Sequence, residues 1–226
     1  TTGSSNVAMG VNTMFNNTTG DQNTALGSYS LYSNITGTAN AAFGYTSLYS
    51  NTHGTHNTAN GVVALKNNTT GSSNTATGNG SLYSNTTGTH NTANGVYSAR
   101  SNTTGTQNTA IGYNALYENT TGIKNTALGT KSGYQNTSGD NNVFIGYNAG
   151  NNSNYQTVSN KLVVANSDTE TPLIEGDFSA KTLKVNGSIE ANSMTTTGIG
   201  DRYYTLDLDV TVGGQQDLDL SNKLGI

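Results

Sequence analysis

The chain has 226 residues, of which only 32% are hydrophobic and 10% are charged. This composition excludes a thick globular core, because ordinary domains contain roughly 45–50% apolar residues. The low charge also disfavours intrinsic disorder. Order must therefore come from a regular backbone hydrogen-bond ladder, from polar side-chain ladders and from contacts between chains.

The formal net charge of −4 leaves no basic stripe for phosphates, so we expect no nucleic-acid partner. The absence of cysteine excludes a disulfide framework and thiolate metal sites. No apolar run approaches the roughly 18 residues of a membrane helix, so no membrane insertion is expected. The sequence starts inside a repeat without an initiator methionine, which is typical of a fragment.

A motif of the form Asn-x-Ala-x-Gly recurs every 17 residues through residues 1–150. A fixed period near 20 residues without helical spacing indicates a solenoid, whose units bury little alone and stack on their neighbours. The asparagine of the motif occupies nine positions: Asn6, Asn23, Asn40, Asn57, Asn74, Asn91, Asn108, Asn125 and Asn142. A second glycine keeps the same spacing: Gly3, Gly20, Gly37, Gly54, Gly71, Gly88, Gly105, Gly122 and Gly139.

Each repeat is too rich in glycine, asparagine and threonine to form a helix. We expect two short strands per coil, one at Asn-Thr-Ala-x-Gly and one around Ser-Leu-Tyr. The glycines are expected at corners with φ > 0, and Asn-Thr-Thr-Gly, as at Asn85–Gly88, is turn chemistry. The predicted fold class is all-β: a parallel β-solenoid or β-roll of nine 17-residue coils at 1–150, followed by a small β-rich C-terminal region.

Alternation along the first strand places its alanines inside the coil. These alanines are Ala8, Ala25, Ala42, Ala59, Ala76, Ala93, Ala110 and Ala127. We expect them to face a second column: Met14, Leu31, Leu48, Leu65, Leu82, Ala99 and Leu116.

The residue after each alanine position then points outwards, and most of these residues are large and apolar. An apolar row along a rod is unfavourable in water, so we expect it to meet identical rows from sister chains. The predicted interface is Met9, Leu26, Phe43, Asn60, Thr77, Asn94, Ile111, Leu128 and Ile145. The alternative places this row inside and alanine outside. The pattern alone does not distinguish two chains from three.

Three central members of this row are polar: Asn60, Thr77 and Asn94. On a symmetry axis they form polar layers that fix register and hold water or an anion. Alternatively, this stretch faces solvent because the chains splay apart there.

Two further columns are expected along the coils. The repeated asparagines predict a ladder in which each amide bonds the next coil. Partly exposed aromatic residues form the other column, which either binds glycan rings by stacking or shields the backbone. Its members are Phe15 and the candidate ligand ladder Tyr32, Tyr49, Tyr83, Tyr117 and Tyr134.

The 17-residue period stops after residue 150. A β-rich transition segment is predicted at 151–191, with strands at 161–166, 172–178 and 182–189, and a linker with a C-terminal β-hairpin at 192–226. One face of the hairpin carries Asp207, Asp209, Asp217 and Asp219. This face either binds calcium through its oxygens or is simply solvated.

No catalytic constellation and no cofactor site emerge from the residues. The three histidines, His53, His56 and His90, are expected in exposed turns, and His56 and His90 are too far apart for one metal ion. Polysaccharide cleavage needs paired carboxylates in a cleft, and the repeats contain few acids. We therefore expect a protein that is not an enzyme.

Two parts of the chain resemble known fibres. Asn-Thr-Ala-Leu-Gly at Asn23–Gly27 and Asn-Thr-Ala-Ile-Gly at Asn108–Gly112 resemble the repeat of trimeric autotransporter adhesin heads of the YadA type. This resemblance implies a homotrimer, with two identical partner chains and the apolar row turned to the trimer axis. The repeat differs from that family's in its length of 17 residues. The 142–147, 160–166, 171–178 and 183–189 stretches look like those of phage-type tail fibres, in which they often precede a chaperone domain that is cleaved off.

The function expected from these features is attachment. The chain is predicted to be a non-enzymatic, trimeric extracellular fibre or spike on a cell surface, a virion or an injection particle, with a cell-surface glycan or receptor as its target. One alternative is an ice-binding solenoid, suggested by the threonines Thr24, Thr58, Thr75, Thr92, Thr109 and Thr126. Another is a carbohydrate-binding spike.

Overall fold

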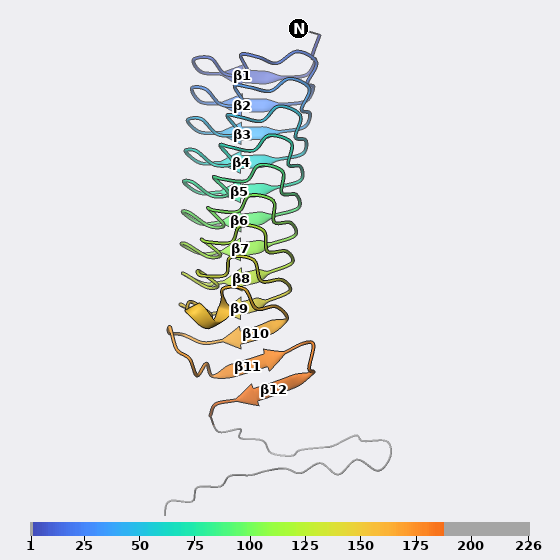
Figure 1. Cartoon of the computed structure of the whole chain (residues 1–226). Coiled ribbons are helices and arrows are strands. Elements are labelled where there is room, and N and C mark those ends of the chain that lie inside the picture. Colours follow the sequence, from blue (N-terminus) through green and yellow to red (C-terminus); the bar gives the residue numbers. More distant parts are fainter. Residues whose placement is uncertain (1, 188–226) are drawn as a thin grey trace, which may run out of the picture. The chain divides into compact units, whose positions relative to one another are not determined.

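The computed structural model describes residues 2–187 as one stack of coils in which a single short strand marks each turn of the chain (Figure 1). Nine three-residue strands belong to the repeats: β1 (Val7–Met9), β2 (Thr24–Leu26), β3 (Ala41–Phe43), β4 (Thr58–Asn60), β5 (Thr75–Thr77), β6 (Thr92–Asn94), β7 (Thr109–Ile111), β8 (Thr126–Leu128) and β9 (Val143–Ile145). A 3₁₀ turn, η1 (Ser153–Tyr155), and three strands follow: β10 (Lys161–Val164), β11 (Ile174–Asp177) and β12 (Thr182–Val185).

The twelve strands form one sheet in chain order. From β1 to β9 the pairing is parallel and each residue lies beside the residue 17 positions later, as in the pairs Val7–Thr24 and Thr58–Thr75. The predicted parallel β-solenoid of nine 17-residue coils is therefore confirmed. Strand β10 continues the parallel pairing, whereas β11 and β12 are antiparallel additions at its end.

Only one strand per coil is present in the repeats, so the expected second strand around Ser-Leu-Tyr is wrong. That segment is a turn in which the leucine has left-handed geometry, with φ near 50° at Leu48 and Leu65. The turn still bonds the next coil, since the Leu48 N–H donates to the Ala64 carbonyl at 3.0 Å. Positive φ is costly for such residues, but it buries the leucine side chain completely.

The two glycine series have different roles, so the expectation that both form φ > 0 corners holds for one of them. Gly27 has φ of 126°, as do its equivalents within a few tens of degrees. Gly20 does not have a positive φ. It is required because a Cβ there would lie 2.3 Å from the carbonyl oxygen of Gly37 in the next coil. Close approach of coils, rather than backbone freedom, selects the second glycine.

The interior is the predicted column of alanines facing a column of leucines. Ala25 to Ala127 and Leu31 to Leu116 are fully or almost fully buried. In the last coil the large side chain stands at the alanine position and the small residue at the leucine position. Phe144 takes the alanine position, and glycine takes the leucine position at Gly133 and Gly150, against which the phenyl ring packs. Tyr155 of η1 then packs edge-on against Phe144, with ring centroids 5.9 Å apart.

Two buried asparagine ladders run along the interior. In the predicted ladder, the Asn57 side-chain amide donates to Asn40 Oδ1 at 3.2 Å and to the Gly71 carbonyl at 2.8 Å. In a second ladder, Asn68 donates to Asn51 Oδ1 at 2.8 Å and to the same Gly71 carbonyl at 2.9 Å. The first ladder is confirmed. The asparagines of the second ladder were expected only as turn residues. Each glycine carbonyl thus accepts from both ladders.

Replacing one ladder asparagine tests this arrangement. Asn74 Oδ1 accepts from the backbone N–H of Asn91 at 3.0 Å, so Asn74→Ala leaves that buried donor without a partner. We expect a loss of about 2–4 kcal/mol in urea denaturation, since each orphaned buried group costs roughly 1–3 kcal/mol. Asn79→Ala, at an exposed position of the same coil, is the control. Equal effects of the two substitutions would contradict the ladder's role.

The exchange of sizes in the last coil can be tested by reversing it. Phe144→Ala should cost about 3–5 kcal/mol through the cavity it leaves. Gly150→Leu alone should also destabilise, because a Cβ at Gly150 lies 2.2 Å from the Phe144 ring. The double variant recreates the alanine–leucine pairing of the other coils. Its loss in thermal denaturation should be smaller than the sum of the two; strict additivity would be evidence against the complementarity.

Candidate functional site

The predicted interface residues form one unbroken column, which we call the outer column. Each is the last residue of its strand, and the parallel register sets them side by side from β1 to β9. The side chains of Met9, Ile111, Leu128 and Ile145 are 67%, 41%, 37% and 38% exposed in the single chain. Leu26 and Phe43 are half-buried.

The orientation of the two faces is settled by the burial of the alanines. Because Ala25 to Ala127 are at 0% exposure while the outer column is open, the alternative with the faces exchanged is wrong. Among the polar members, Asn60 and Asn94 are exposed and Thr77 is half-buried. These polar residues lie together on β4, β5 and β6, in the middle of the column.

The outer column is longer than the sequence indicated. Through the strand register it continues from Ile145 to Val164, Ile174 and Val185 on β10, β11 and β12. A separate set of exposed apolar and aromatic residues lies two positions after six of the nine repeat strands. The 17-residue spacing alone could have identified this set. The sequence analysis missed it because a glycine separates these residues from the strand, so the alternation of the strand does not reach them. Its apolar members are Val11, Tyr45, Val62, Val96, Tyr113 and Tyr147.

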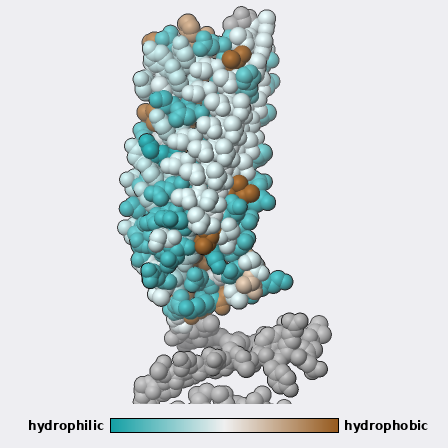
Figure 2. Space-filling view, viewed as in Figure 1, coloured by the Kyte–Doolittle hydropathy of each residue, from teal (hydrophilic) through white to brown (hydrophobic). Residues whose placement is uncertain are grey.

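The threonines that suggested ice binding lie on the same outward face as the outer column. Ala41 interrupts their row, and a threonine at both outward positions of a strand occurs only on β5, at Thr75 and Thr77, among the nine repeat strands. The face shown in Figure 2 has a pale band of near-neutral residues along the rod, with scattered apolar ones. A flat array of paired threonines is not formed.

The predicted tyrosine ladder is a partly buried stack on the coil surface. Phe15 stacks on Tyr32 at 5.6 Å between ring centroids, and Tyr32 stacks on Tyr49 at 5.1 Å. Near the other end, Tyr117 stacks on Tyr134 at 5.0 Å and within 2° of parallel. Burial raises the pKa of Tyr134, and the nearby Glu118 carboxylate adds to this shift.

Two cations fill the gaps in this stack. Lys66 and Arg100 occupy the repeat position that tyrosine holds elsewhere. The Lys66 ammonium lies 5.7 Å from the Tyr83 ring centroid. Arg100 lies 5.1 Å from the ring of Tyr83 and 5.8 Å from that of Tyr117. Sequence reasoning listed only the aromatic members, although the 17-residue spacing identifies the cations too.

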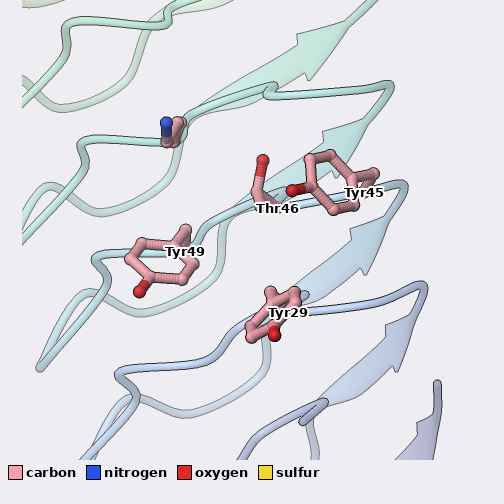
Figure 3. Close-up of a pocket in the computed structure, with 5 residues that line it drawn as sticks. Tyr29, Tyr45, Thr46 and Tyr49 are labelled. Carbon is pink, nitrogen blue, oxygen red and sulfur yellow. The ribbon is translucent and has the colours of Figure 1, made fainter. Parts of the chain in front are cut away.

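A pocket of about 370 Å³ opens beside the stack (Figure 3). Tyr29 comes from one coil, Tyr45, Thr46 and Tyr49 from the next, and Lys66 from the third. Figure 3 shows the rings of Tyr45 and Tyr49 on either side of Thr46. Of these residues the sequence analysis had singled out only Tyr49.

The transition segment holds the other ionisable contacts. Lys161 and Asp177 form an ion pair at 2.6 Å, and hydrogen bonds from Lys161 and Ser179 hold the pKa of Asp177 well below its usual range. Burial raises the pKa of Tyr155, whose hydroxyl donates to Glu175 at 3.1 Å. These contacts join β10, β11 and η1 and are accounted for by folding.

Residues 2–187 contain no group of three His, Asp or Glu side chains placed to share a metal ion. His53, His56 and His90 are exposed, as expected. The proposed calcium face at Asp207, Asp209, Asp217 and Asp219, with the hairpin that carries it, lies outside the described residues.

No helix within the described part of the chain has the length and apolar character needed to cross a membrane. Comparison with known proteins gives no match to a protein-family model, to a curated protein or to a solved structure.

Arg100 lies against three tyrosine rings, so removing it tests directly whether the stack stabilises the rod. Arg100→Ala loses contacts with the rings of Tyr83, Tyr97 and Tyr117, so we expect a loss of about 1.5–3 kcal/mol, at roughly 0.5–1 kcal/mol per exposed contact. Arg100→Tyr restores a stacked ring and should recover most of it. Urea denaturation of both variants measures the difference, and an equal loss in both would argue against the stack.

Proposed function

We propose that the chain is a non-enzymatic attachment protein that works as a fibre or spike of three identical chains outside the cell. The observation that carries the proposal is the outer column, which keeps one register along the rod and has apolar side chains toward both ends that are open to solvent in a single chain. Exposed apolar patches of this extent mark interaction sites. A repeated row is matched most simply by the same row on another copy.

The position of the polar residues supports a symmetric bundle. Asn60, Thr77 and Asn94 interrupt the apolar column only at its centre. Methionine, leucine and phenylalanine precede them, and isoleucine and leucine follow them. In a bundle, such layers fix the register of the chains at some cost in stability. The continuation through Val164, Ile174 and Val185 extends the same surface beyond the repeats. Three chains, rather than two, are chosen from the resemblance to trimeric adhesin heads.

The proposal that the protein is a scaffold without catalysis rests on its chemistry. The side chains of the repeats are mainly amides, hydroxyls and small apolar groups, which suit ladders and stacks rather than acid–base chemistry. A rod held by the same hydrogen bonds in every coil is a suitable spacer for presenting a binding surface away from its anchor. Attachment through the fibre surface follows from this form.

The mass in solution tests the assembly. We expect a value near three times 23.4 kDa by sedimentation. Introducing two charges with Ile111→Asp and Leu128→Asp should give monomers, because each buried carboxylate would be desolvated without a partner. The control pair Thr104→Asp and Thr121→Asp adds the same charge at exposed turn positions of the same coils and should keep the wild-type mass.

Circular dichroism of both pairs shows whether the coils remain folded. A wild-type chain that stays monomeric at high concentration would overturn the proposed assembly. A dimer would keep the outer column as the interface and would reject the trimer.

A further inference from the structure

The pocket beside the stack has aromatic walls at right angles. The rings of Tyr29 and Tyr45 are 6.4 Å apart with an angle of 87° between their planes. Tyr45 is 54% exposed, so its ring is open to a ligand. Tyrosine offers an apolar face and a hydroxyl together, which suits ligands with both characters.

A buried hydroxyl without a partner lies in the wall of this pocket. Thr46 is only 7% exposed, and its Oγ1 atom makes no hydrogen bond within the described residues. Native proteins leave few such groups unsatisfied, so each one calls for an explanation. Rotation of the Thr46 side chain toward the pocket would bring this hydroxyl within reach of a ligand that carries hydroxyl groups.

Similar residues recur at the equivalent repeat positions four coils further along the rod. Adding 68 to the residue numbers of Tyr29, Tyr45, Thr46 and Tyr49 gives Tyr97, Tyr113, Asn114 and Tyr117. Tyr113 is 48% exposed, as Tyr45 is 54% exposed. Asn114 is buried, and its Oδ1 atom is also without a partner. Three tyrosines and one unsatisfied polar group therefore occur twice at equivalent positions.

Each constellation has a cation at its side. Lys66 lines the first pocket, and no acidic residue does. Arg100 lies 5.4 Å from the ring of Tyr97 and donates to the Tyr117 hydroxyl at 3.3 Å in the second. Glu118 lies near Tyr134, just beyond the second site. The negative charge of Glu118 makes the second site less favourable for anions. The charge at the first site favours a ligand with a negative group.

We propose that these two constellations are binding sites for an acidic saccharide chain. This proposal rests on the attachment function and names its ligand class. A sugar ring lays its apolar C–H face on tyrosine, its hydroxyls pair with the phenol groups and with Thr46 or Asn114, and its carboxylate meets Lys66. The pocket's 370 Å³ lies within the range for small ligands. At about 4.8 Å per coil, the sites are roughly 19 Å apart, so one chain of sugars can occupy both.

The experiment uses immobilised oligosaccharides that contain uronic or sialic acids, each paired with its carboxyl-reduced form. We expect the wild-type protein to bind carboxylated members and to bind their reduced forms several-fold more weakly. Tyr45→Ala should weaken binding roughly fivefold through the loss of one aromatic contact. Tyr45→Ala with Tyr113→Ala should abolish the avidity gained from two sites. Lys66→Gln should reduce the preference for the carboxylated form, because it removes the cation of the first site.

Val62→Ala is the matched control, because Val62 occupies the repeat position of Tyr45 in the following coil and is 45% exposed. Binding by this variant should equal that of the wild type. The sites are rejected if no saccharide binds, if binding ignores the double tyrosine variant, or if an acidic peptide competes as well as the best saccharide. Sedimentation of every variant separates this result from assembly: trimers without saccharide binding reject the sites and leave the fibre intact.

Discussion

The structure depends on one repeated interaction, the convergence of two asparagine amides on a glycine carbonyl. At Gly71 the carbonyl accepts from Asn57 and from Asn68, and the approach is close enough to exclude any side chain at the glycine. Buried amides are costly when unpaired and strongly favourable when fully paired. Because every coil repeats the same contacts, the 17-residue period becomes a structural requirement. A shift of one residue would leave a whole series of amides without partners.

This polar interior explains how a chain with so few large apolar residues folds. The alanine and leucine columns fill only a narrow strip of each coil, and buried asparagines and serines occupy much of the rest. A single column of large apolar side chains, mostly leucines and with Phe144 in the last coil, is enough for the inside of the repeats. Other large apolar residues, such as Met9 and Ile111, stand outside in the outer column. The composition that excludes a globular core is also the one that leaves an apolar surface available for partner chains.

Much of the fold can be predicted from the sequence, because the repeat is strict. The coil length, the inward alanines and the first asparagine ladder follow from spacing and alternation alone. The Ser-Leu-Tyr turn could not be predicted in this way. Alternation assumes an extended backbone, whereas Leu48 and its equivalents bury their side chains from left-handed geometry. The second asparagine ladder was missed for a related reason: Asn-Thr-Thr-Gly is common turn chemistry, and only the stacking of coils reveals that its asparagine is buried.

The candidate surfaces differ in what the sequence can show. The outer column follows one repeat position and was found whole within the repeats, whereas its extension over β10, β11 and β12 needs the strand register. The tyrosine pocket combines three repeat positions from three successive coils, so no single column of the repeat displays it. Strict repetition builds the rod, and departures from it are where specific chemistry can appear. Tyr29, Tyr45 and Lys66 all stand at positions that vary between coils. In a solenoid of this kind, the repeat positions that stay constant from coil to coil therefore explain folding. The surface positions that vary between coils are where a ligand can be recognised.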